Sequence, residues 1–215
     1  MAFFTDEVVK SNAEKYKELL RQITRQGSRV EELINYLESN GFFEAPASTS
    51  YHNSCKGGLC AHCLNVYDNL CMLYRNMICN EIEPQVHETL IIIALLHDVS
   101  KTGIYQQTFK NKKVYSENGS KSDNGGRFDW ISVPGYEMKP VDQRMVYGNH
   151  EQNAEYIARC FIPLTTEEGS AILHHMGGMS WDSAKDNIGE VFGRYPLALL
   201  LYQSDMLSTY INERE

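Results

Sequence analysis

The sequence predicts a single domain of the all-α class, a helical bundle with one small β-hairpin as an insertion. Two observations predict this. Capping residues, prolines and glycines divide most of the 215-residue chain into segments of helical length. Hydrophobic residues make up 42% of the chain, enough for one full core, and only residues 104–147 have a different, polar composition.

Two helices, at 5–26 and 28–40, are expected to form an N-terminal hairpin within residues 1–41. Glycines follow both segments, as is common where helices end. Ser28-x-x-Glu31 has the pattern of a capping box that opens the second helix. The polar segment that comes next is expected to be a loop that leads into the core.

The helical core is expected at residues 59–103 and 148–212. Prolines suit the first turn of two of its helices. Thr165-x-x-Glu168 has the pattern of another capping box. The expected core helices are 59–80, 84–103, 150–160, 165–175 and 196–207.

Residues 104–147 are rich in Lys, Asn, Gly and Ser, and we interpret them as a polar insertion with a β-hairpin between two core helices. Strands are expected near 113–115 and 128–133. Trp130 and Tyr136 are expected to pack the hairpin against the domain. The alternative is that these aromatic rings stack on a nucleic-acid base.

The formal charge of −8 disfavours binding to long nucleic acids, because they are bound through clustered Lys and Arg. The first residues lack a signal-peptide pattern and no apolar stretch is long enough to cross a bilayer, so a cytoplasmic protein without a membrane partner is expected. The six cysteines are then expected to be reduced. One alternative to simple core packing is a zinc site formed by His52, Cys55, Cys60 and Cys63.

Ionisable side chains recur along the predicted core helices in an order typical of a buried metal site. Two of them, His97 and Asp98, end the apolar run 89–96. An unpaired carboxylate in such a setting is costly, and a divalent cation removes the cost by binding the carboxylate and the neutral imidazole. The candidate ligands are His62, His97, Asp98, His150, His174, His175 and Asp205.

Each candidate also has an ordinary structural role as an alternative. His150 could cap a helix, and Lys101 could be a solvated residue near a helix C-terminus. His174 and His175 would point about 100° apart on a helix, so one of them alone could bind. The metal interpretation therefore depends on the complete series of ligands.

The residues around these ligands resemble motifs of the HD-domain superfamily of metal-dependent phosphohydrolases. Residues 57–62 (GGLCAH) resemble the family's GGLxxH helix start, and residues 94–101 (ALLHDVSK) resemble its ALLHDxxK core. Ser204-Asp205 resembles the closing aspartate, so the likeness spans about residues 52–210. The GGL motif before the histidine is similar to that of bacterial HD-domain 3′–5′ exoribonucleases. The Gly-Tyr-Pro signature of HD-GYP proteins is absent from the sequence.

The resemblance implies a role for each matching residue. A first metal would be bound by the two histidines and two aspartates of the mononuclear family members, here His62, His97, Asp98 and Asp205. The additional histidines, His150 and His174-His175, would hold a second metal beside it, with Asp98 as the bridge. Lys101 would lie against the substrate phosphate.

The implied activity is hydrolysis of a phosphoester of a nucleotide, cyclic nucleotide or short oligonucleotide by a metal-activated hydroxide, with Asp98 and Lys101 as the catalytic residues. One or two divalent ions of Mn, Fe, Zn, Co or Ni suit the imidazole and carboxylate donors. Two alternatives are a mixed-valent diiron oxygenase with a similar ligand set and a non-catalytic module that senses a nucleotide. The expected partner is a small phosphorylated substrate, and a homo-oligomer is left open.

Overall fold

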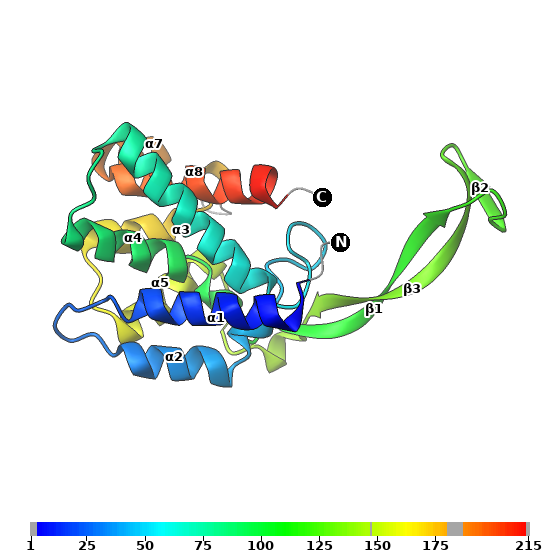
Figure 1. Cartoon of the computed structure of the whole chain (residues 1–215), viewed down its shortest axis with the longest axis horizontal. Helices are drawn as coiled ribbons and strands as arrows, with labels where there is room; N and C mark the ends of the chain where they lie inside the picture. Colours follow the sequence, from blue (N-terminus) through cyan, green and yellow to red (C-terminus); the bar gives the residue numbers. More distant parts are fainter. Residues whose placement is uncertain (1–3, 147, 180–186, 214–215) are drawn as a thin grey trace.

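Figure 1 shows a helical body from which one long β-hairpin projects; this computed structural model describes residues 4–146, 148–179 and 187–213. The body contains α1 (Asp6–Leu20), α2 (Val30–Ser39), α3 (Gly58–Met77), α4 (Pro84–Leu96), α5 (His150–Phe161), α6 (Thr166–Leu173), α7 (Ile188–Arg194) and α8 (Pro196–Leu207). The strands β1 (Tyr105–Tyr115), β2 (Lys121–Asp123) and β3 (Gly126–Met138) form an antiparallel sheet in the order β1-β3-β2. The protein is therefore mainly helical, and the all-α class is too narrow a description because it leaves out this sheet.

The core is built around α4, in which every residue from Leu90 to Leu96 is buried. This helix packs against α1, α3 and α6, so it has neighbours on several sides. A helix surrounded in this way needs apolar residues on all of its faces, which explains the unbroken apolar run. None of the helices in the described ranges combines the length and the apolar content needed to cross a membrane.

The N-terminal hairpin forms, but its second helix does not begin with the expected capping box. The N-cap residue of α2 is Arg29, which makes no side-chain capping bond, and the hydroxyl of Ser28 has no hydrogen-bond partner. The backbone N–H of Arg29 instead donates to the carbonyl of Phe161 in α5, at 2.8 Å. The tertiary hydrogen bond between Arg29 and Phe161 is therefore present at the start of α2, where the sequence predicts a local capping box.

Several core helices begin where the sequence predicts. Asn149 caps α5, Pro196 occupies the first turn of α8, and the capping box of Thr165 and Glu168 is present at the start of α6. The short helix α7 has no counterpart among the expected helices. Because α6 ends at Leu173, its last expected residues lie beyond the helix.

The helix α4 also ends early, at Leu96 instead of near residue 103. His97 caps it, Asp98 leaves helical geometry with φ −108° and ψ 14°, and a 3₁₀ turn over Val99–Lys101 follows. This turn brings the ammonium of Lys101 to 2.7 Å from Oδ2 of Asp98. The break in the helix thus places a cation and a carboxylate side by side at the end of the most buried helix.

The hairpin insertion is confirmed, but its strands are longer than the sequence predicts. β1 and β3 pair from Tyr105 opposite Met138 to Tyr115 opposite Phe128. Trp130 does not pack against the helical body, contrary to expectation. It lies well along the hairpin, 48% exposed, and its ring meets Phe128 edge-on instead.

Candidate metal centre

Six of the seven candidate ligands lie together inside the helical body, and two further residues lie beside them. The six come from α3, the end of α4, the first residue of α5, the residues after α6, and α8. Their ligand atoms form overlapping groups of three, within each of which all atoms lie within 4.8 Å of one another. The gathered candidates are His62, His97, Asp98, His150, His175 and Asp205, and the two further residues are His52 and Glu213.

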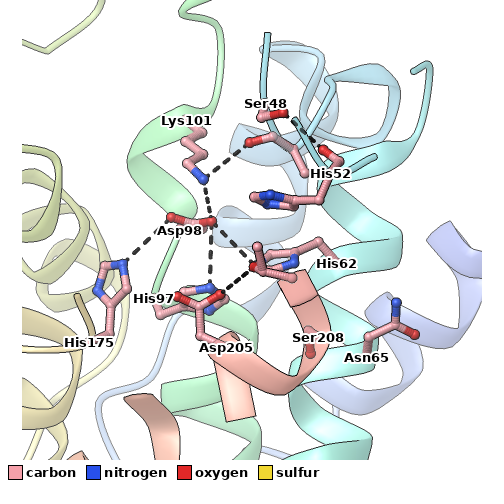
Figure 2. A network of polar contacts seen from close by, with 12 residues as sticks. Ser48, His52, His62, Asn65, His97, Asp98, Lys101, His175, Asp205 and Ser208 are labelled. Carbon is pink, nitrogen blue, oxygen red and sulfur yellow. Dashed lines mark hydrogen bonds and ion pairs between the residues drawn. The ribbon is translucent and has the colours of Figure 1, made fainter. Parts of the chain in front are cut away.

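Asp98 lies between two sets of imidazoles. Its Oδ2 is 3.5 Å from Nε2 of His97 and 3.7 Å from Nε2 of His62. Its Oδ1 is 3.5 Å from Nδ1 of His150 and 3.7 Å from Nε2 of His175. Figure 2 shows His175 on one side of the carboxylate and His62 and His97 on the other. A carboxylate with imidazoles at both oxygens suits a bridge between two cations.

Backbone hydrogen bonds fix the direction in which two of these rings face. Nδ1 of His97 donates to the carbonyl of Ala94 at 2.8 Å, and Nδ1 of His175 donates to the carbonyl of Ile172 at 2.7 Å. Because a carbonyl can only accept, Nδ1 carries the proton and Nε2 keeps its lone pair. Orientation of metal-binding histidines by their other ring nitrogen is the usual arrangement in proteins.

Several of the atoms by which these rings and Asp98 face one another lack hydrogen-bond partners. Nε2 of His97, Nε2 of His175, Nδ1 of His150 and Oδ1 of Asp98 are all buried, and none of them is hydrogen-bonded. A polar atom left unpaired in a protein interior costs about 1–3 kcal/mol. A cation between these atoms would remove that cost, so the residues fit a metal.

The spacing of the donors also fits an ion. Two ligand atoms that each lie about 2.1 Å from one ion are about 3.0 Å apart at octahedral angles and about 3.4 Å apart at tetrahedral angles. Oδ1 of Asp205 is 3.2 Å from Nε2 of His62, and Asp98 lies only slightly farther from its imidazoles, at 3.5–3.7 Å. Nitrogen and oxygen donors without a thiolate suit Mn, Fe, Zn, Co or Ni.

His62 has a carboxylate at each ring nitrogen. Nδ1 donates to Glu213 at 3.1 Å, and Nε2 faces Asp205. Burial opposes protonation of the ring, but the hydrogen bonds to these carboxylates outweigh burial and raise the pKa of His62 to about 10. Burial lowers the pKa of His97 to about 3 and that of His150 to about 4, so both rings are neutral at pH 7 and can bind a cation.

Lys101 adds a positive charge to the site. Its Nζ donates to Asp98 and, at 3.1 Å, to the carbonyl of Ala47. Burial disfavours the charge, but the carboxylate of Asp98 keeps the pKa of Lys101 above its ordinary value. Burial in turn favours protonation of Asp98, yet Lys101 and the surrounding imidazoles hold the pKa of that carboxyl well below its usual range.

The structure separates the two adjacent histidines that follow α6. His175 is fully buried and faces Asp98, as described above. His174 is half-buried, its Nδ1 donates to the carbonyl of Ser170 at 2.8 Å, and it belongs to none of the ligand groups found among the described residues. Of the two histidines, His175 therefore lies at the candidate site.

His52 lies in a possible ligand group with His62 and Glu213, whereas the sequence suggests it as a ligand only of the alternative zinc site with the cysteines. Both of its ring nitrogens are buried without a hydrogen-bond partner, and its ring lies 4.9 Å from that of His62. The nearest signal is the glycine pair that opens α3. Gly57 has φ +77°, and a Cβ on Gly58 would lie 2.0 Å from the carbonyl oxygen of Asn53. Only glycine permits this close approach, which brings the loop with His52 over the site.

Glu213 was also missed. It follows the π-helical turn Ser208–Asn212, and that segment has no apolar pattern that predicts a continued helix after α8. The one available signal is its distance from Asp205, which is eight residues or about two helical turns earlier. That spacing is informative only if the helix is known to continue.

The cysteines take no part in the centre. Cys60 and Cys63 pack in the hydrophobic core. Burial raises the pKa of Cys60 to about 12 and that of Cys63 above its ordinary value, so both stay as neutral thiols. No ligand group among the described residues contains a cysteine, which leaves the alternative zinc site without support.

A cavity of about 610 Å³ opens onto several of the candidate ligands. This volume lies in the usual range for sites that bind small molecules. One part of its wall is charged or metal-binding, and another part is made of methionine and tyrosine side chains. The lining residues are Tyr51, His52, Asp98, Lys101, His150, Met176, Met179, Asp205, Met206, Thr209, Tyr210 and Glu213.

Comparisons with known proteins assign no family to the chain: no family model, no curated protein and no solved structure matches it. The chemistry of which the site is capable is therefore indicated by its own residues. Those residues are a buried cluster of imidazoles and carboxylates that could hold a metal ion, with a lysine beside them.

Proposed function

We propose that the protein is a metal-dependent phosphohydrolase of the HD-domain type that acts on a phosphoester of a nucleotide, cyclic nucleotide or short oligonucleotide. One observation carries the proposal: the buried carboxylate of Asp98 faces imidazoles with both oxygens, accepts a hydrogen bond from Lys101, and lies in the wall of a ligand-sized cavity. Cations gathered at such a wall attract an anionic group. A phosphoester is the anionic substrate whose hydrolysis this charge pattern assists most directly.

The donors divide into two sets around Asp98. His62 and His97 lie on the side of Oδ2, and His150 and His175 lie on the side of Oδ1. Asp205 lies beside His62 and within reach of both His97 and His175. Each set could hold one divalent ion. Bound ions supply a water of lowered pKa and neutralise phosphoryl oxygens during in-line attack.

Lys101 would act on the substrate directly. Its ammonium is fixed by Asp98 and by the backbone of Ala47, so it needs little reorganisation when a phosphate arrives. A positioned cation stabilises the negative charge that grows on the phosphoryl oxygens in the transition state. Asp98 orients this cation, whereas backbone carbonyls orient the rings of His97 and His175.

The apolar part of the cavity supports a substrate with a nucleoside or similar group. Tyr51 and Tyr210 line the cavity together with Met176 and Met206. Aromatic rings and methionine thioethers offer stacking and dispersion contacts to a base. A substrate that consisted of phosphate alone would leave this wall unused.

The test begins with metal analysis of protein purified without added ions. The protein is then stripped, reloaded with Mn, Fe, Ni, Zn or Mg, and assayed under air and without dioxygen against nucleotides, cyclic nucleotides and short oligonucleotides. We expect oxygen-independent phosphate release, and we expect Asp98→Ala to lower the metal content and abolish turnover. The matched control Asp142→Ala changes an exposed aspartate and should alter neither quantity. Full metal content and full rate in Asp98→Ala would contradict the proposal, and turnover that requires dioxygen would replace it with oxygenase chemistry.

A further inference from the structure

The hairpin of β1, β2 and β3, residues 105–138, takes no part in the metal centre and is here called the arm. Its strands pack mainly on one another, and Figure 1 shows that they extend away from the helices. A two-stranded ribbon is marginally stable by itself in water. An arm of this length is therefore expected to have a packing partner.

The arm exposes large apolar side chains on both of its faces. Successive residues of a strand point to opposite faces, so Trp130 and Ile131 face opposite ways, as do Tyr115 and Val114. These four side chains are 39–50% exposed. Phe109, nearer the helical body, is 74% exposed. Exposed apolar groups of this kind mark interaction surfaces, and here a partner has to contact both faces.

One face of the arm is already organised by contacts within it. The ring of Phe128 lies between those of Tyr115 and Trp130, at centroid distances of 5.7 and 5.9 Å, and the ammonium of Lys113 lies 4.3 Å from its centre. This cluster makes the outer part of the arm a preformed element. A preformed element loses little conformational entropy when it binds.

The charge of the arm contrasts with that of the remainder of the chain. The arm, residues 105–138, contains five basic and four acidic side chains, a net +1, which leaves −9 on the other residues when the total is −8. A surface with this charge is attracted to an acidic body such as that of a second copy. The excess of positive charge is too small for a site that follows a nucleic-acid backbone.

The basic residues also limit how two copies could meet. β1 is an edge strand and carries Lys110, Lys112 and Lys113. Lysines on an edge strand oppose pairing of that edge with another strand, because they bring like charges together. The arm of one copy is therefore expected to contact helices of the other copy and not its arm.

We infer that the arm clasps the helical body of a second copy of this chain. Reciprocal exchange of two arms about a twofold axis would use each arm once and would close the assembly as a dimer. The inference stands apart from the proposed function, because it uses no residue of the metal centre. It also explains why an acidic protein has a basic arm with apolar side chains on both faces.

The test measures the molar mass of the full chain in solution by light scattering and by sedimentation velocity over a dilution series. We expect a dimer for the unaltered protein. The double substitution Trp130→Ser with Ile131→Lys should weaken the dimer by at least about tenfold. It should keep a cooperative unfolding transition and an unchanged metal content, because the arm is no part of the core. The matched control Ser132→Thr, at an exposed neighbouring position, should remain dimeric.

A second pair of substitutions, Lys112→Glu with Lys121→Glu, tests the charge argument without removing apolar surface, and it should also weaken the dimer. A monomer at every concentration would overturn the inference, as would a dimer that is unaffected by both pairs of substitutions. A monomer that binds labelled single-stranded RNA through Trp130 would assign the arm to nucleic acid instead. If the protein with Trp130→Ser and Ile131→Lys lost its cooperative unfolding transition, the arm would belong to the core. That result would also contradict the inference.

Discussion

The hydrogen bond between His62 and Glu213 gives a sharp prediction about metal affinity. Nδ1 of His62 lies 3.1 and 3.2 Å from the two oxygens of a carboxylate whose side chain is 2% exposed. Asn65 donates a further hydrogen bond to this carboxylate at 2.9 Å and holds it in place. Substitution Glu213→Ala would leave the imidazole of His62 without its orienting partner.

Two independent considerations give the size of the effect. Loss of the hydrogen-bond partner of a metal-binding histidine typically weakens metal binding 10–100-fold, which corresponds to about 1.4–2.7 kcal/mol. A hydrogen bond to a charged group contributes about 1.5–3 kcal/mol, so the two ranges agree. We expect Glu213→Ala to bind Mn²⁺ or Zn²⁺ about 10–100-fold more weakly in competition with a chelating dye.

Glu213→Gln separates orientation from direct ligation. An amide oxygen can still accept the Nδ1 proton, so a residue that acts through His62 should lose less affinity as Gln than as Ala. Glu81→Ala, at an exposed carboxylate outside the site, is the matched control and should bind as the unaltered protein does. A folded Glu213→Ala protein that binds metal as tightly as the control would refute the reasoning. Equal losses in Gln and Ala would show that the carboxylate itself is a ligand.

Three further predictions use other parts of the structure. Under the proposed function, Lys101→Met should keep its metal, measured by elemental analysis, but lose about 10²–10³-fold in turnover, because it removes only the cation that would face the substrate phosphate. His175→Ala should lose metal affinity while His174→Ala keeps it; equal losses in a metal titration would contradict the separation of the two rings. Glu168→Gln should lower the free energy of unfolding by about 3 kcal/mol, measured by urea titration, because Arg25 forms a bidentate pair with this buried carboxylate at 2.6 and 2.7 Å. Burial opposes ionisation of Glu168, but Arg25 and other hydrogen-bond donors hold its pKa below the ordinary 4.5, so this stability is present above pH 4.5 and is lost as the pH falls below it. The difference between the unaltered protein and Glu168→Gln should therefore narrow in acid.

The candidate ligands could be found from the sequence because of what surrounds them. Asp98 and Asp205 interrupt strongly apolar segments. A carboxylate in such a segment is expected to be buried, and a buried carboxylate needs a hydrogen-bond donor or a cation as its partner. Core helices with local signals, such as the box of Thr165 and Glu168, also begin as expected. In these cases the local pattern and the tertiary environment favour the same structure.

Other features depend on contacts that no local pattern contains. Ser28 has the sequence of a helix cap but no hydrogen-bond partner, because the next residue is fixed by a backbone contact to α5. Glu213 reaches His62 across 151 residues of sequence. The strands of the arm extend into Gln, Lys and Asn residues of low strand propensity, since their pairing is set by the partner strand. Tertiary contacts of this kind cannot be derived from one segment at a time.

The candidate metal centre is organised by the fold alone, without an ion. The rings of His97 and His175 are held by backbone carbonyls of their own segments, so their free nitrogens face Asp98 without help from a metal. The buried atoms that remain unpaired destabilise the folded protein, and the apolar shell of α4 offsets this cost. A site held in this way selects an ion through the spacing of fixed donors, because the rings cannot move far to suit another geometry. The burial that makes the unpaired donors costly would therefore also make them effective ligands.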